Sequence, residues 1–309
     1  MTNNNPKNTD KSYASLVQMA SKMAILVATI LVITKVYAWW ISGSSAMLAS
    51  TTDSLLDVFA SLSSFIIIRF SLTPADDEHK FGHGKAENLA ALMQSSFVLG
   101  SALLLIFHGV DRIYSPQVIE QTSTAIGISI LAIVLTLALI AVQKYVISKT
   151  NSIAISADSL HYQSDLWLNA GVILALLLNQ YNWPQTDGIF TVLVGGFLLF
   201  GAAKIVYHSI QDLMDRELAD SDLDSIKQVI NSHPEAIGFH ELRTRQSGKM
   251  RFIQFHLELD DNLSLLEAHK ISDEVEQQLL QIFTDTEVFI HQDPQSVVPK
   301  ELANSQLNS

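Results

Sequence analysis

The chain has 309 residues, of which 48% are hydrophobic and only 16% are charged, and it contains no cysteine. This composition is typical of a membrane protein with a soluble portion, and it excludes disulfides and thiolate metal sites. The net charge is −12, and residues 212–309 hold 19 Asp and Glu against 8 Lys and Arg. An acidic C-terminal region argues against a nucleic-acid partner and favours a cationic one.

The first two thirds of the chain consist mainly of apolar segments. Residues 1–12 are polar, lack the apolar core of a removable signal peptide and are expected to be disordered. Lys and Arg are concentrated in alternate linkers, which predicts that both termini face the cytoplasm. Residues 13–211 are therefore predicted to form a six-helix, all-α transmembrane domain, with spans at about 14–41, 46–70, 88–111, 122–146, 153–179 and 187–210.

The C-terminal third has the pattern of a small soluble domain. Its second helix carries the capping pair Ser264 and Glu267. The order α-β-β-α-β over residues 212–298 predicts a cytoplasmic α+β domain of the metallochaperone type, and residues 299–309 are expected to be a disordered tail. The periodicity of the apolar residues places the elements at helix 220–232, strands 238–245 and 250–259, helix 264–283 and strand 287–291.

Two of the predicted spans carry ionisable side chains four residues apart. Asp53 and Asp57 share one face of the second span, and His161 and Asp165 share one face of the fifth. A carboxylate inside a membrane costs free energy and is rarely present without a function, and the basic residues of the spans lie toward their ends. Facing each other, the two pairs would make a tetrahedral site for a divalent cation. The alternative is polar contact between helices or a buried ion pair. Asp158 is interpreted as a residue of the mouth or a cap rather than a ligand.

A second candidate site lies in the loop after the second span. Asp76, His79 and His83 are three and four residues apart, so one helical turn could bring them to a single cation. The alternative is a charged loop exposed to solvent. The Gly-His-Gly-Lys string in this loop lacks the pattern of a phosphate-binding loop.

A third candidate site is spread over the C-terminal domain. His240 and His256 fall on neighbouring predicted strands, so a sheet could place them within ligand distance. The alternative is a set of unrelated surface histidines, and three further histidines are interpreted as structural: His108, His208 and His233. The candidate ligands are His240, His256, His269, His291 and Asp293.

Together, the six spans, the two ligand pairs, the Phe-Gly-His-Gly-Lys-Ala-Glu loop and the acidic α+β tail resemble the cation diffusion facilitators. The resemblance covers about residues 12–297. It implies a homodimer in the inner membrane that exports Zn²⁺ in exchange for protons. It also implies that Zn²⁺ is both transported and structural, that there is no organic cofactor, and that the protein contacts membrane lipid and is not an enzyme.

The resemblance also assigns roles to the three sites. The intramembrane residues would form the transport site, Asp76 and its neighbours the loop site, and the tail residues a two-metal site at the dimer interface. Lys85 and Asp215 match a salt bridge that interlocks subunits of this family. Two other classes stay open from the residues alone, a divalent cation channel without proton coupling and an intramembrane metalloenzyme. Three oxygens and one imidazole suit Zn²⁺, Cd²⁺, Fe²⁺ and Mn²⁺ alike.

Overall fold

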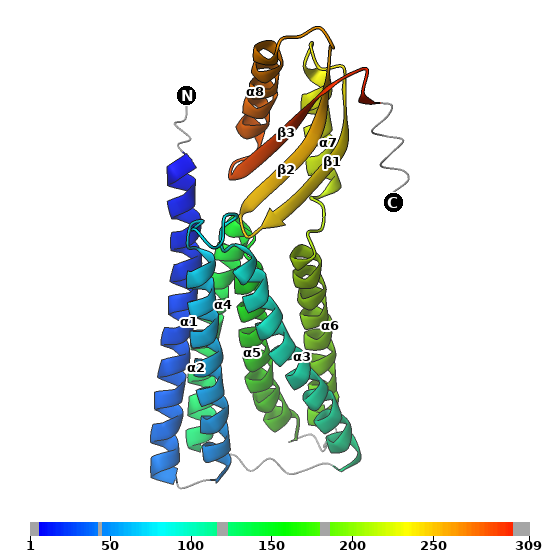
Figure 1. Ribbon diagram of the computed structural model, residues 1–309. Helices are drawn as coiled ribbons and strands as arrows, with labels where there is room; N and C mark the ends of the chain where they lie inside the picture. Colours follow the sequence, from blue (N-terminus) through cyan, green and yellow to red (C-terminus); the bar gives the residue numbers. More distant parts are fainter. Residues whose placement is uncertain (1–5, 43–44, 116–122, 180–185, 299–309) are drawn as a thin grey trace. The chain divides into compact units, whose positions relative to one another are not determined.

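The computed structural model describes residues 6–42, 45–115, 123–179 and 186–298. The chain divides into two compact units, residues 11–210 and residues 211–309 together with the first ten residues. The first unit is helical and the second is an α+β domain, as the sequence predicts (Figure 1).

Each predicted span corresponds to one long helix of the first unit. The first helix starts earlier than expected, because residues 6–12 are helical rather than disordered. Proline is favoured at the first position of a helix, where its missing N–H has no partner to lose. The helices are α1 (Pro6–Ser42), α2 (Ser45–Ser71), α3 (Lys85–Tyr114), α4 (Ser123–Thr150), α5 (Ile153–Asn179) and α6 (Thr186–Leu213).

Five of these helices, α1, α2, α3, α4 and α6, are long and apolar enough to cross a membrane within the residues searched. The sixth predicted span is α5, a helix of 27 residues whose segment 166–179 contains no charged residue. The side chains of residues 172–179 lie outside the described part, so this span stays a prediction.

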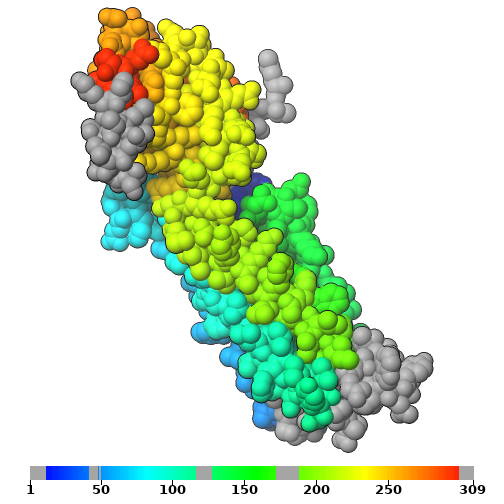
Figure 2. All heavy atoms as spheres, turned by 90° about the vertical axis from the view of Figure 1, so that its right-hand side faces the viewer, coloured from blue at the N-terminus to red at the C-terminus, as the bar shows by residue number. Residues whose placement is uncertain are grey.

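The outer surface of the helices is apolar. Side chains such as Phe59, Phe107 and Phe200 are about 70% exposed or more, as expected for a surface that faces lipid rather than water. α3 and α6 form adjoining ridges on the face shown in Figure 2. Their backbones approach closely at glycines, since a Cβ on Gly109 would lie 3.0 Å from the carbonyl oxygen of Gly188.

The second unit contains a three-stranded sheet with two helices on one face. Leucine, isoleucine, valine and phenylalanine side chains from the helices and the sheet form one buried core. The sheet order is β1-β2-β3, with β1 and β2 antiparallel and β2 and β3 parallel. The elements are α7 (Asp220–Ser232), β1 (Gly238–Ser247), β2 (Met250–Leu259), α8 (Leu265–Ile282) and β3 (Thr286–Pro294), which confirms the predicted order (Figure 1).

The two faces of the sheet differ in chemistry because side chains alternate along a strand. On β2, Ile253, Phe255 and Leu257 are buried in the core, whereas His256 and Glu258 lie on the other face. The predicted capping box of α8 is present, with the N–H of Glu267 donating to Ser264 and the N–H of Ser264 donating to Glu267. Among residues 211–298, the described part of this unit's C-terminal segment, no helix covers this polar face of the sheet.

Candidate metal centres

Three residues of the predicted transport site lie together between α2 and α5. His161 Nε2 is 3.1 Å from Asp57 Oδ1 and 3.9 Å from Asp165 Oδ2. One ligand atom from each residue lies within 4.8 Å of the others. The spacing of four residues puts His161 and Asp165 on one face of α5, and α2 supplies Asp57 opposite them. The arrangement offers an imidazole and two carboxylates to one cation.

Asp53, the fourth predicted residue, lies one helical turn before Asp57 and outside this close group. It lines the same cavity, which has a volume of about 530 Å³ and is bounded by side chains from α1 to α5. Polar side chains on the wall include Ser101, Thr136 and Asn169. The cavity therefore joins all four predicted transport residues, although only three are within mutual ligand distance.

Lys35 on α1 adds a basic group to this cavity. Its ammonium donates a hydrogen bond to Ser54 Oγ over 2.6 Å, and Lys35 lines the same cavity as Asp53. Lys35 lies toward the end of its span, as expected from the sequence, but a lysine side chain is long enough to reach the neighbouring helix α2. A basic group therefore lies in the cavity that the acids line.

Asp158 was expected at the mouth of the site or as a cap, and that interpretation is wrong. Its side chain is only 2% exposed and accepts a hydrogen bond from Gln143 Nε2 on α4 over 2.8 Å. The helical period turns this position of α5 toward α4. Asp158 therefore ties two helices together in the interior.

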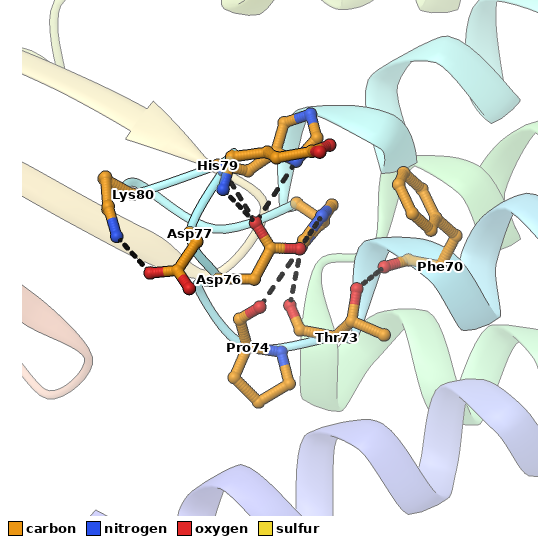
Figure 3. Close-up of polar contacts among 9 residues, drawn as sticks. Phe70, Thr73, Pro74, Asp76, Asp77, His79 and Lys80 are labelled. Carbon is orange, nitrogen blue, oxygen red and sulfur yellow. Dashed lines mark hydrogen bonds and ion pairs between the residues drawn. The ribbon is translucent and has the colours of Figure 1, made fainter.

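The loop between α2 and α3 brings Asp76, His79 and His83 together. Figure 3 shows the side chains of Asp76 and His79 in this loop. Asp76 Oδ1 is 3.4 Å from His79 Nδ1, and Asp76 Oδ2 is 3.3 Å from His83 Nε2. His83 is buried against Phe70, while its Nδ1 faces the carbonyl oxygens of Thr73 and Pro74.

The loop gathers these residues by turns, so the predicted helical turn is wrong. Pro74 disfavours a continuation of α2. The N–H groups of His79 and Glu78 then donate to the Asp76 carboxylate over 2.7 and 3.0 Å. The bond from His79 contributes most to lowering the pKa of the Asp76 carboxyl below its usual value, and the bond from Glu78 acts in the same direction. The carboxylate therefore stays charged, and able to bind a cation, at a lower pH than an ordinary aspartate.

The third cluster lies on the uncovered face of the sheet. In the strand register His240 pairs with His256, and His256 pairs with His291, so the three imidazoles form a row across β1, β2 and β3. Asp293 is 3% exposed and joins the row, with its Oδ2 2.6 Å from His256 Nδ1 and its Oδ1 3.1 Å from His291 Nε2. His240, His256 and Asp293 meet within ligand distance.

His269 does not join this row within one chain. It lies on α8, where its Nε2 is 3.6 Å from Asp273 Oδ2, and its side chain is exposed. Lys85 is the first residue of α3, and Asp215 forms an ion pair with Arg245 inside the second unit. A single chain leaves the predicted salt bridge between subunits untested, so that contact and the role of His269 stay predictions.

Two acidic residues beside the row were missed. Glu258 Oε1 lies 3.0 Å from His240 Nδ1, and Glu241 Oε2 lies 4.0 Å from His256 Nε2. Alternation along β2 puts Glu258 on the face of His256, which was a usable signal. Glu241 sits at a bulge with a positive φ of 49°, and the pattern of the residues does not reveal that irregularity.

Comparison with protein families gives two matches that together cover most of the chain. Residues 21–214 match the cation efflux transmembrane domain, and residues 218–295 match the cytoplasmic domain of cation efflux proteins. The boundary between the two matches lies close to the boundary between the two structural units.

Individual relatives extend this result over nearly the full length. The chain is 45% identical over 292 residues to the cation-efflux pump FieF of Salmonella choleraesuis (strain SC-B67), covering 94% of this chain and 97% of the relative. It is 50% identical over 287 residues to FieF of Shewanella oneidensis, covering 93% and 97%.

Two of the solved structures that resemble the chain match about a quarter of it. A CzrB structure in its Zn form is 30% identical over 26% of this chain and 94% of that chain, with a TM-score of 0.26. The metal-bound C-terminal domain of the CzcD transporter from Thermotoga maritima is 28% identical over 25% of this chain and 94% of its own, with a TM-score of 0.24.

Proposed function

Because the chain belongs to the cation efflux family, the cation diffusion facilitators, we propose that it exports divalent metal cations, chiefly Zn²⁺, in exchange for protons. The observation that carries the proposal is the group of Asp57, His161 and Asp165 on two apolar helices, in a cavity that Asp53 also lines. Three acids and one imidazole offer four donors in the tetrahedral number that Zn²⁺ prefers, while Cd²⁺ and Fe²⁺ suit the same donors.

Proton exchange follows from the chemistry of these ligands. A metal binds a neutral imidazole and ionised carboxylates, so loading of the site releases protons and protonation of the site releases the metal. With protons more concentrated outside, protonation from that side favours release of the metal outward. Movement of one group of helices against another would expose the site to each side in turn.

Two other functions make different predictions. A divalent cation channel would conduct whether or not a pH gradient is present, and a metalloenzyme would keep three protein ligands and an open position for water. Metal flux into proteoliposomes, measured with several divalent ions and with or without a pH gradient, separates the exchanger from the channel. Zinc uptake that follows the imposed pH gradient supports the exchanger, and uptake indifferent to the gradient supports the channel.

We further propose that the protein works as a homodimer in the inner membrane, with both termini in the cytoplasm. The alternation of basic linkers supports this orientation. The uncovered histidine face of the sheet supports contact between two copies, with bound metal and with His269 near the interface. Lys85 and Asp215 would form the salt bridge that links the two subunits.

We expect the Asp76→Ala variant to keep substantial transport and to lose one bound metal per subunit. Asp76 is an exposed loop residue, and its carboxylate faces both His79 and His83. Isothermal titration of the full chain with zinc measures the number of bound ions. Asp77→Ala is the matched control, because Asp77 pairs with Lys80 in the same loop. An unchanged metal count in Asp76→Ala would remove the loop site from the proposal.

We expect the C-terminal unit to dimerise more tightly when zinc is bound. Residues 212–309 carry 19 acidic against 8 basic residues, so two copies repel each other, and divalent ions at the histidine face would offset that repulsion. The unit has its own buried core, so it can be studied alone. Sedimentation of residues 212–309 with zinc or with a chelator measures the dimer fraction, and His256→Ala is the control. Equal dimer fractions in both conditions would contradict this role.

A further inference from the structure

In the histidine row on the sheet, the imidazole of His240 contacts a carboxylate through the ring nitrogen that does not face Asp293. His240 Nδ1 lies 3.0 Å from Glu258 Oε1, while its Nε2 faces Asp293 Oδ2 at 3.5 Å. An ionised carboxylate can only accept a hydrogen bond, so Nδ1 carries the proton in this contact. In a neutral ring, Nε2 then bears the lone pair and points toward the acidic side of the cluster.

The position of Glu258 depends on a glycine in the neighbouring strand. Gly238 pairs with Glu258 in the strand register. A Cβ on Gly238 would lie 2.9 Å from Glu258 Oε2 and 3.2 Å from its Cδ. Any other residue at position 238 would therefore push this carboxylate aside, at little cost to the fold because the end of the Glu258 side chain can move.

We propose that Glu258 is a positioning residue for the cytoplasmic metal cluster, held by the space above Gly238 and acting through His240. It touches the imidazole and not the metal. Its work is to keep the proton on Nδ1, to aim Nε2 at the ion shared with His256 and Asp293, and to make that nitrogen a stronger donor. This inference rests on the proposed metal site in the C-terminal unit.

The test uses the full-length protein with Asp57→Ala and Asp76→Ala as background, so that zinc binding reports the sheet cluster. Zinc affinity is measured by competition with a chelator. Glu258→Met removes the acceptor at nearly constant length, Glu258→Gln keeps a carbonyl acceptor without the charge, and Gly238→Ala displaces the native carboxylate. Glu287→Met is the control, because Glu287 is an exposed residue four positions before His291 on the same strand.

We expect Glu258→Met to weaken zinc binding by about ten- to a hundredfold, with Gly238→Ala in the same direction. Glu258→Gln should retain part of the zinc affinity. The zinc affinity of Glu287→Met should stay within about twofold of the background, since no contact joins Glu287 to a candidate metal ligand among the described residues. The visible spectrum of bound Co²⁺ gives a second readout, because band intensity reports coordination geometry. At saturating cobalt, Glu258→Met should still differ from the background, which a loss of stability alone would not cause.

The outcomes separate this inference from the proposed function. If the background protein binds zinc and both Glu258→Met and Gly238→Ala bind it equally well, Glu258 positions nothing. Equal losses in Glu258→Met and Glu258→Gln, with an unchanged cobalt spectrum, would assign the effect to charge and also overturn the positioning role. If the background protein binds no zinc, the sheet cluster is not a metal site, and both proposals for it fail.

Discussion

Asp57→Ala is expected to abolish zinc export while the protein still inserts into the membrane and dimerises. Asp57 is the proposed ligand from α2, and its Oδ1 lies 3.1 Å from His161 Nε2, so its loss removes the carboxylate that α2 contributes to the group. Removal of a direct ligand should weaken the site by more than the roughly ten- to hundredfold that outer partners contribute. Initial rates of zinc uptake into proteoliposomes should fall to the level of empty vesicles.

Packing gives no comparable reason for a loss of activity. The Asp57 side chain is about a quarter exposed toward the cavity, and alanine is a good helix former at this position. Asp111→Ala is a matched control, because Asp111 is an exposed aspartate near the end of α3. Normal zinc uptake by Asp57→Ala at equal protein content would remove Asp57 from the transport site.

The fold was predictable where one periodicity covers many residues. Long apolar runs located α1 to α6, and alternation located the strands, because burial in lipid or against a helix acts on every residue of an element. The helix ends were less predictable. α1 begins at Pro6 rather than near residue 14, and α4 continues to Thr150 rather than to residue 146, although α2 ends within one residue of its prediction. Such ends depend on single local contacts rather than on a repeated pattern.

The candidate sites were predictable as residue types and less so as geometry. Spacing of four residues put His161 and Asp165 on one face, and the structure adds Lys35 and Ser54 to the same cavity. Whether a lysine side chain reaches the cavity that the acids line depends on how neighbouring helices pack, and the spacing of residues within one helix does not show this. The same limit applies to the sheet, where the register that aligns His240 with His256 includes a bulge just after His240.

The second large effect is expected from His161→Asp, which removes the imidazole of the transport group. An ordinary imidazole titrates at about pH 6.5 and an ordinary carboxylate at about pH 4, so the imidazole is the natural group to exchange a proton for a metal around neutral pH. In the proposed transport site, metal and proton would compete for Nε2, which faces both Asp57 and Asp165. One displaced proton makes zinc affinity fall by about tenfold for each pH unit below the imidazole transition.

The variant replaces this nitrogen by an oxygen, so two changes should follow. The pH dependence of zinc binding near neutrality should flatten, and preference should shift toward harder ions such as Mn²⁺, since an all-oxygen site suits them better. The measurement is zinc and manganese affinity from about pH 5.5 to about pH 8, in a background that lacks the loop and sheet clusters. His208→Asp is the control, because it makes the same change on α6 at an exposed position. If His161→Asp keeps the steep pH dependence of its parent, the imidazole does not carry the exchanged proton. The coupling is then assigned to the aspartates of the described cluster.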